Sequence, residues 1–357
     1  MAVGALVLNA IQLSTYAITP GQAEPVGPLI HVSGLKSDPT NDKIMLTDVY
    51  LKQLTALSWL TEHLQSHVEF VTYDQLLSPG VPASQLDAQG FIDMSVSKDN
   101  ARVAALTYLG WKIPAMPAGA TVYAVPTGTP AAAAHLDVGD RIVEVGTTPV
   151  HSECQLVAAI HDMSPGTVVA LEVRVATITD TGLVILAKPT VFHATLGAPP
   201  KDLGASGCPG VTGAPRAYLG VISQDAVDYT FPGNIAISTP DIGGPSAGLA
   251  MTLGLIDRLS GGSLTRHLAV AATGTIDPSG NVGDVGGVAE KTIAVEDAGA
   301  KIFFVPTVEA TVAQNASDGH LRIVAVATLA QALAALERLG ATPPTPLTKP
   351  YPLKAAT

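Results

Sequence analysis

Residues 273–291 read Thr-Gly-Thr-Ile-Asp-Pro-Ser-Gly-Asn-Val-Gly-Asp-Val-Gly-Gly-Val-Ala-Glu-Lys, and they decide the fold together with residues 241–248, which read Asp-Ile-Gly-Gly-Pro-Ser-Ala-Gly. In the second run, Ser246 stands at a tight Gly/Pro turn before an expected helix over 246–259, so its hydroxyl is presented rather than packed. The first run ends on Lys291. A serine hydroxyl and a lysine amine together suggest a peptidase that works without a catalytic histidine.

The helix expected over 288–298 places Lys291 on an apolar face. The other positions on this face are Val288, Val295 and Ala298. Glu290 and Asp297 are expected to point elsewhere. Burial disfavours the ammonium form and lowers the pKa from about 10.4 towards about 7–8, the range that a general base needs. The alternative is a lysine that snorkels to the surface.

These runs resemble the proteolytic domain of Lon, where a T-G-E-I-T … G-x-V-x-x-I-G-G-x-x-E-K segment follows D-G-P-S-A-G. The resemblance covers residues 236–306 and implies that Ser246 is the nucleophile and Lys291 the general base. It implies that Thr273 hydrogen-bonds and orients the lysine, while the backbone of Gly243 and Gly244 lets a substrate strand approach. Two positions depart from the family: Thr275 replaces its Glu, and Gly243 replaces the Asp before Gly-Pro-Ser, whose role is absent or falls to Asp241.

The run 244–248 also matches the G-x-S-x-G nucleophile elbow of α/β-hydrolases. An esterase of that class needs an acid and then a histidine downstream, for which Asp277 or Asp297 with His320 would serve. Pro245 does not suit the strained elbow, and little chain remains for the rest of a wound sheet. We therefore rank this esterase third.

Residues 118–196 carry a pattern of short strands. The run from Gly128 to Ile142, with Gly-Thr-Pro-Ala-Ala and Leu-Asp-Val-Gly-Asp-Arg-Ile, resembles bacterial PDZ domains. PDZ domains bind a peptide as an added strand while backbone N–H groups hold its terminal carboxylate. The resemblance implies a peptide beside residues 121–125, with these contact residues: Ala118, Gly119, Thr121 and Tyr123. A PDZ fold used only as a spacer is the alternative.

The chain divides by composition and pattern into six segments, and its predicted class is α+β. We expect an apolar N-terminal segment (1–24), an α/β region (25–115), a small β-rich PDZ domain (116–197), a Gly/Pro/Ala-rich linker (198–215), a Lon-type domain of mixed sheet and helices (216–340) and a Pro-rich tail (341–357). The PDZ domain is predicted to be inserted into a Lon-type fold whose first strands lie in residues 40–112.

The N-terminal segment allows more than one interpretation. Residues 2–18 are mostly apolar, and no Lys or Arg precedes Lys36. A membrane anchor is the favoured interpretation; a buried first strand or helix and a loose tail are the alternatives. The whole arrangement resembles the YlbL-type PDZ-containing Lon-like proteases, which implies one membrane anchor with the other domains outside the cytoplasm.

Composition narrows the partners. The chain has 357 residues with a net charge of −11, which argues against nucleic-acid binding. No G-x-x-x-x-G-K-[ST] occurs, so no nucleotide or other cofactor is expected. His63 and His67 lack a third ligand for a metal. Cys154 and Cys208 either pair or stay as buried thiols, and the second is favoured because so large a chain needs no staple.

The leading prediction is an ATP-independent serine endopeptidase that cleaves peptides or proteins. The resemblance to Lon also makes a homo-oligomeric ring plausible. A catalytically inactive PDZ scaffold is the second candidate, although a relic site would be expected to lose at least one of Ser246, Lys291 and Thr273.

Overall fold

The computed structural model describes residues 8–37, 43–65, 67–179, 182–261, 264–266 and 268–341. They form two compact units. We call residues up to 76, 96–113 and from 231 onward the outer unit, and residues 77–95 and 114–230 the inserted unit. Both units mix helices and strands, as the α+β prediction requires, and the long helix α4 (Leu86–Tyr108) contributes to each.

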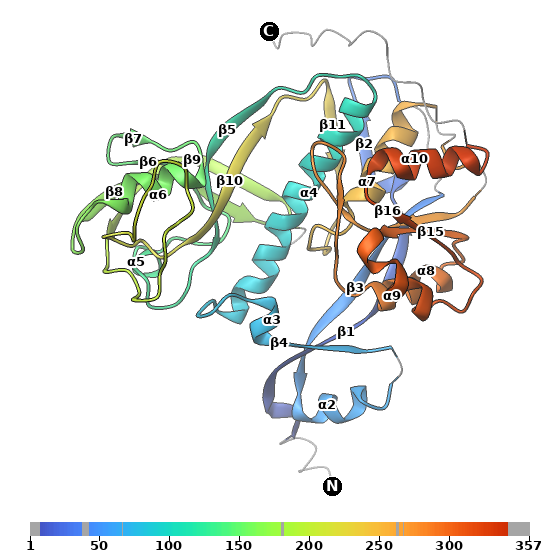
Figure 1. Cartoon of the computed structure of the whole chain (residues 1–357), viewed down its shortest axis with the longest axis horizontal. Helices are drawn as coiled ribbons and strands as arrows, with labels where there is room; N and C mark the ends of the chain where they lie inside the picture. Colours follow the sequence, from blue (N-terminus) through green and yellow to red (C-terminus); the bar gives the residue numbers. More distant parts are fainter. Residues whose placement is uncertain are drawn as a thin grey trace. The chain divides into compact units, whose positions relative to one another are not determined.

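The outer unit is built on a six-stranded sheet with the order β16-β15-β12-β3-β1-β4 (Figure 1). Its strands are β1 (Gln12–Pro25), β3 (Ile44–Thr55), β4 (Glu69–Thr72), β12 (Val270–Ala272), β15 (Ile302–Pro306) and β16 (Arg322–Val326). The strands from β3 to β16 are parallel, and β1 runs antiparallel to β3 and β4. Because β3 pairs with β12, residues from both ends of the chain share one sheet. This is the arrangement that the insertion hypothesis describes.

The second half of the segment interpreted as an anchor is a sheet strand. Tyr16, Ala17 and Ile18 of β1 are buried, and Ile18 pairs with Leu51 of β3. The strand alternative is therefore correct for residues 12–25, while residues 1–7 lie outside the described part of the chain. Among the helices that the structure describes, none is long and apolar enough to cross a membrane.

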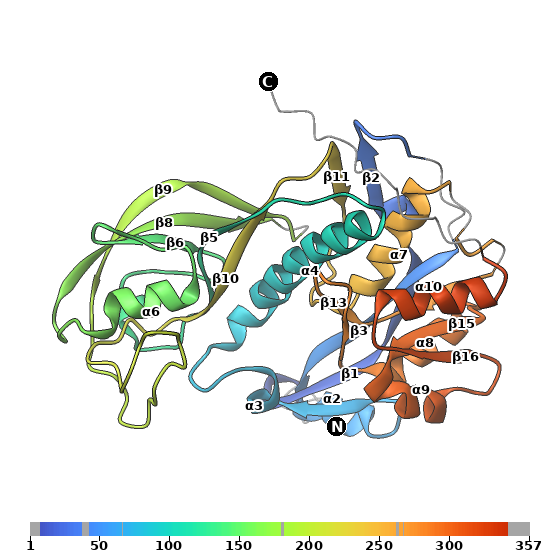
Figure 2. The same cartoon turned by 45° about the horizontal axis from the view of Figure 1, so that its top comes forward.

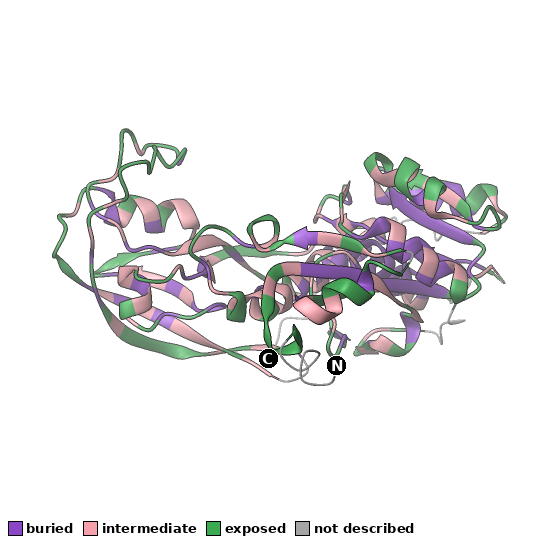
Figure 3. Cartoon of the chain, turned by 90° about the horizontal axis from the view of Figure 1, so that it is seen from below, coloured by how far each residue is buried: buried purple, intermediate pink, exposed green. Residues whose placement is uncertain are grey.

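Helices cover the outer sheet. They are α2 (Ala56–Glu62), α3 (Tyr73–Leu76), α7 (Gly248–Leu259), α8 (Val288–Asp297), α9 (Ala310–Ala316) and α10 (Leu329–Arg338), with the 3-10 turns η1 (Gly27–Leu29) and η3 (Thr307–Glu309). Helix α8 packs on β1 and β3 and lies beside α9 (Figure 2). Every residue of β15 is buried, so this strand is apolar on both faces. Figure 3 colours the chain by burial and shows strand stretches that are buried throughout, whereas helices mix buried and exposed residues. Two small ladders complete the unit: β2 (Ile30–Ser33) with β11 (Asn234–Ile237), and β13 (Thr275–Ile276) with β14 (Val282–Gly283).

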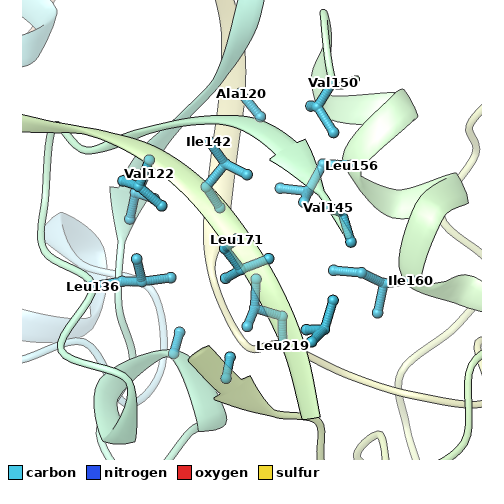
Figure 4. Packing of buried hydrophobic residues seen from close by; sticks show 14 of the residues in the cluster. Ala120, Val122, Leu136, Ile142, Val145, Val150, Leu156, Ile160, Leu171 and Leu219 are labelled. Atoms are coloured by element: carbon cyan, nitrogen blue, oxygen red, sulfur yellow. The ribbon is translucent and has the colours of Figure 1, made fainter. Parts of the chain in front are cut away.

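The inserted unit is built on an antiparallel sheet with the order β10-β5-β6-β8-β9, in which β7 also pairs with β6. Its elements are η2 (Ala83–Gln85), β5 (Ala115–Ala124), α5 (Pro130–Ala133), β6 (Arg141–Val145), β7 (Thr148–Pro149), α6 (Glu153–His161), β8 (Val168–Ile178), β9 (Val184–Thr195) and β10 (Ile222–Tyr229). Val122, Ile142 and Leu171 of the sheet meet Leu156 and Ile160 of α6 in its core (Figure 4).

Two boundaries differ from the predictions. Strand β10 was expected in the Lon-type domain, but it pairs with β5 along its whole length and belongs to the inserted unit. The expected linker contains no helix and no long strand, yet it is not free, because Cys208 forms a disulfide with Cys154 of α6. The favoured interpretation of two buried thiols is wrong.

Candidate functional site

The loop between β11 and α7 presents Ser246. Gly244 has φ +82°, a conformation that favours glycine, and a Cβ built there would meet no atom within 4 Å. The backbone carbonyl of Ser246 accepts hydrogen bonds from Gly274 N (2.9 Å) and Thr273 Oγ1 (3.2 Å). Ser246 is half-buried. The loop is thus held by Thr273 and Gly274, and there is open space beside Gly244.

A second support comes from α4. Ser97 Oγ donates to the carbonyl of Pro245 at 3.0 Å. A Cβ on Gly248 would lie 2.9 Å from Ile276 N and 3.1 Å from Ser97 Oγ, so only glycine fits there. Sequence reasoning did not single out Ser97, because no motif marks it.

The N–H groups of Ser246 and Ala247 are available to a ligand. Neither donates a hydrogen bond within the described chain, and both precede the first turn of α7. Uncommitted N–H groups at a helix start, with the positive end of the helix dipole behind them, can stabilise an oxyanion.

Lys291 is buried in α8, with 3 % of its surface exposed. Val288 and Val295 on the same face belong to the core cluster, as predicted, whereas Ala298 lies just past the helix end and is exposed. Burial lowers the pKa of Lys291 to about 8, against the opposing attraction of Glu309, Asp48 and Glu290. About a tenth of the amine is therefore neutral at pH 7, and about half at pH 8.

One prediction about α8 is wrong. Glu290 was expected to point away from the apolar face, but it is buried, and its Oε2 has no hydrogen-bond partner among the described residues. Burial raises the pKa of the Glu290 carboxyl. Asp297 is exposed, as expected.

Ser246 and Lys291 are assembled at the same edge of the sheet. Thr273, which holds the Ser246 carbonyl, directly follows β12, and Glu309, which acts on Lys291, follows the neighbouring parallel strand β15. Asp48 also belongs to this edge, because Met45 of β3 pairs with Ala271 of β12. Carboxyl ends of adjacent parallel strands are a common place for active sites.

The two side chains are not hydrogen-bonded to each other. Within the described residues no bond joins Ser246 Oγ to Lys291 Nζ, and Thr273 donates to the Ser246 backbone instead of contacting the lysine. Thr273 therefore holds the loop that carries Ser246, and its expected role of orienting the lysine stays a prediction. Asp241, the residue that might replace the family's Asp, is exposed.

The esterase triad is not assembled. His320 is exposed and precedes β16, so it lies at the amino end of the parallel strands, opposite the edge that carries Ser246. Asp277 is engaged in its own turn, accepting from Asn281 Nδ2 at 2.7 Å. Among the described residues no group of His, Cys, Asp and Glu could hold a metal ion, and His63 Nδ1 instead contacts Trp59 O.

A groove of about 310 Å³ lies in the inserted unit between α6 and β10. Its apolar lining includes Leu156, Ile160, Leu203, Leu219 and Val221. Within the described chain β10 is an edge strand, paired only with β5. An edge strand beside an apolar groove can accept a peptide as an added strand.

The loop that leads into β10 forms one end of this groove. Leu219, Gly220 and Val221 line it, and their three N–H groups donate no hydrogen bond within the described residues. Gly220 has φ +82°, and a Cβ there would lie 2.4 Å from Thr129 Cβ, so glycine is required. Three consecutive free N–H groups form a nest for a carboxylate.

The residues predicted to contact a peptide do not lie at a free edge of the sheet. Ala118, Gly119, Thr121 and Tyr123 lie within β5, which is paired with β10 on one side and contacts β6 on the other. Tyr123 Oη donates to Asp93 Oδ2 at 2.9 Å. The signal that was missed is the apolar-Gly-apolar run at 219–221 before a strand.

Comparisons with known families support both the predicted PDZ domain and the predicted Lon-type domain. A family model described as the PDZ domain matches residues 91–175, and one described as the Lon protease (S16) C-terminal proteolytic domain matches residues 233–336. The first match stops before β10, and the second begins after it. No curated protein matches the chain.

Proposed function

This chain is a PDZ-containing Lon-like protein with a serine peptidase domain, and we propose that Ser246 and Lys291 form its catalytic dyad. The observation that carries the proposal is the nearly complete burial of Lys291. It lies at the same edge of the sheet as Thr273, which holds the loop of Ser246. A buried amine with a pKa of about 8 is suited to be a general base.

The mechanism follows from these groups. Neutral Lys291 takes the proton of Ser246 Oγ as Oγ attacks the peptide carbonyl carbon, and the N–H groups of Ser246 and Ala247 hold the resulting oxyanion. The ammonium of Lys291 then returns a proton to the leaving amine, and the C–N bond breaks. Water, deprotonated by Lys291, hydrolyses the acyl-enzyme and restores Ser246.

In this proposal, substrate binding must also bring Ser246 and Lys291 together. Because Ser246 Oγ and Lys291 Nζ are not hydrogen-bonded in the free chain, a movement of the loop or of the lysine side chain must bring them together. Catalytic hydrogen bonds commonly tighten only in the substrate complex. The open space beside Gly244 leaves room for a substrate backbone.

We propose that peptide cleavage by this chain does not require ATP. We also propose that substrates bind in the groove between α6 and β10. No phosphate-binding loop motif occurs in the sequence. The Cys154–Cys208 disulfide supports an oxidising location outside the cytoplasm, because disulfides rarely persist in reducing compartments.

Cleavage of a flexible protein such as casein by the full chain, without ATP, tests this function. Ser246→Ala should abolish cleavage and labelling by a fluorophosphonate, while peptide binding to the groove persists. Unchanged cleavage by Ser246→Ala would exclude the nucleophile. Binding without any cleavage by the unmodified chain would favour the inactive scaffold.

A further inference from the structure

The groove between α6 and β10 is apolar at one end and acidic at the other. Glu153, the first residue of α6, lines it, and its N–H donates to Oδ1 of Asp225 on β10 at 2.7 Å. Neither carboxylate has a cationic partner within the described chain. By contrast, Asp228 on the same strand is paired with Arg141 at 2.7 Å. Two carboxylates without a cationic partner therefore lie at the start of α6: Glu153 in the lining of the groove and Asp225 bonded to the first N–H of the helix.

The register of a docked peptide follows from strand geometry. A C-terminal segment whose carboxylate sits on the N–H groups of Leu219, Gly220 and Val221 runs antiparallel to β10. With its last residue opposite Val221, the second residue before the last lies opposite Ser223. The fourth residue before the last then lies opposite Asp225. Directly opposed residues of an antiparallel pair point to the same face, about 5 Å apart at Cβ.

Asp225 is directed towards α6, because its carboxylate accepts from the first N–H of that helix. The fourth residue before the last therefore also points to the α6 side, between the two carboxylates. The third residue before the last points to the opposite face, because side chains alternate along a strand. The burial of Glu153 and the repulsion from Asp225 raise the pKa of the Glu153 carboxyl, and a cation between the two would relieve that repulsion.

We propose that the groove selects C-terminal segments with Lys or Arg as the fourth residue before the last, and that Asp225 and Glu153 are the residues that determine this preference. The inference rests on the proposed docking of substrates in the groove. It adds a substrate class: protein C-termini with an apolar last residue and a basic side chain four residues upstream.

Fluorescence anisotropy with the full-length Ser246→Ala protein tests this, because that variant leaves the peptides intact. Three labelled decapeptides end in Val with a free carboxylate and carry Lys, Ala or Glu as the fourth residue before the last. A fourth decapeptide carries Lys as the third residue before the last. We expect the first peptide to bind about three- to tenfold more tightly than the Ala peptide, on the scale of partly exposed ion pairs. Glu at that position should weaken binding further.

Matched variants assign the effect. Asp225→Asn keeps an oxygen that can accept from Glu153 N and removes only one of the two charges, so it should reduce the preference for Lys over Ala. Asp228→Asn makes the same change on the same strand and should leave the preference intact. Equal binding of the Lys and Ala peptides, or tighter binding when Lys is three residues before the end, would overturn the inference. Failure of all four peptides to bind would instead contradict the docking proposed above.

Discussion

Thr273 Oγ1 donates a hydrogen bond to the backbone carbonyl of Ser246 at 3.2 Å. This bond joins the end of a central parallel strand to the loop that carries the proposed nucleophile. Together with the bond from Gly274 N, it fixes the serine backbone while leaving the side chain half-exposed. The geometry of the site therefore depends on a residue that contacts the backbone of the nucleophile rather than its hydroxyl.

Thr273→Val removes this hydroxyl and keeps the shape of the side chain. We expect it to lower the free energy of unfolding by about 1 kcal/mol, the usual net contribution of one hydrogen bond. Cleavage should fall mainly in kcat, because the loop is no longer held. Thr273→Ser, which restores the donor, should recover most of the activity. Full activity in Thr273→Val would show that Gly274 N alone suffices.

Gly248→Ala tests the close contact at the start of α7. Its Cβ would lie 2.9 Å from Ile276 N and Cγ2, too close for ordinary packing. We expect a loss of about 1–3 kcal/mol in stability, measured by urea unfolding, with weaker fluorophosphonate labelling of Ser246. Gly286→Ala is a control, because a Cβ there meets no atom within 4 Å and its φ is not in the left-handed region. Equal stability of the two variants would contradict this packing.

Lys291→Met should remove activity while changing how stability depends on pH. The folded pKa of Lys291, about 8, lies below the ordinary value of 10.5, so protonation favours the unfolded chain. The contribution of Lys291 to the wild-type free energy of unfolding is therefore highest above pH 10.5 and decreases by about 3 kcal/mol in total as the pH falls to about 8. The variant lacks this contribution.

Relative to the wild type, Lys291→Met should thus gain stability as the pH falls from 10.5 to 8, as measured by urea unfolding at several pH values. A constant difference between the two proteins across this range would mean that the lysine is solvated in the folded state.

Reduction of the Cys154–Cys208 disulfide should weaken peptide binding. The segment that contains Cys208 also supplies Leu203, Gly204 and Ser206 to the groove, and the disulfide ties it to α6. Anisotropy with and without dithiothreitol measures the effect, with the Cys154→Ser/Cys208→Ser double variant as the control that should not respond. Equal affinity in both states would show that this wall does not contribute.

Much of the catalytic part was predictable from sequence. Gly244 and Gly287 have left-handed backbone conformations that few other residues adopt, and Val288 and Val295 mark the buried face of α8. These signals are local. Pairing of β3 with β12 is not local, but it agrees with the predicted insertion of the PDZ domain into a Lon-type fold whose first strands lie in residues 40–112.

The groove was misplaced because pairing across the inserted unit is set by tertiary structure. A strand pattern at 115–125 does not reveal which edge is covered, and β10 comes almost a hundred residues later. The buried state of Glu290 could not be predicted either, because helical periodicity places it beside the apolar face rather than on it. The N-terminal strand was misjudged since an apolar run has the same composition in a sheet as in a membrane.

The pH dependence of peptide cleavage tests the central claim most directly. Measured as kcat/KM between pH 6 and 10, the rate should rise about tenfold per pH unit below pH 8 and level off above it, following the neutral amine of Lys291. In Lys291→Ala the rate should fall by at least about a hundredfold, and the rise should vanish. A wild-type rate that is flat over this range, or a rise that persists in Lys291→Ala, would contradict the account.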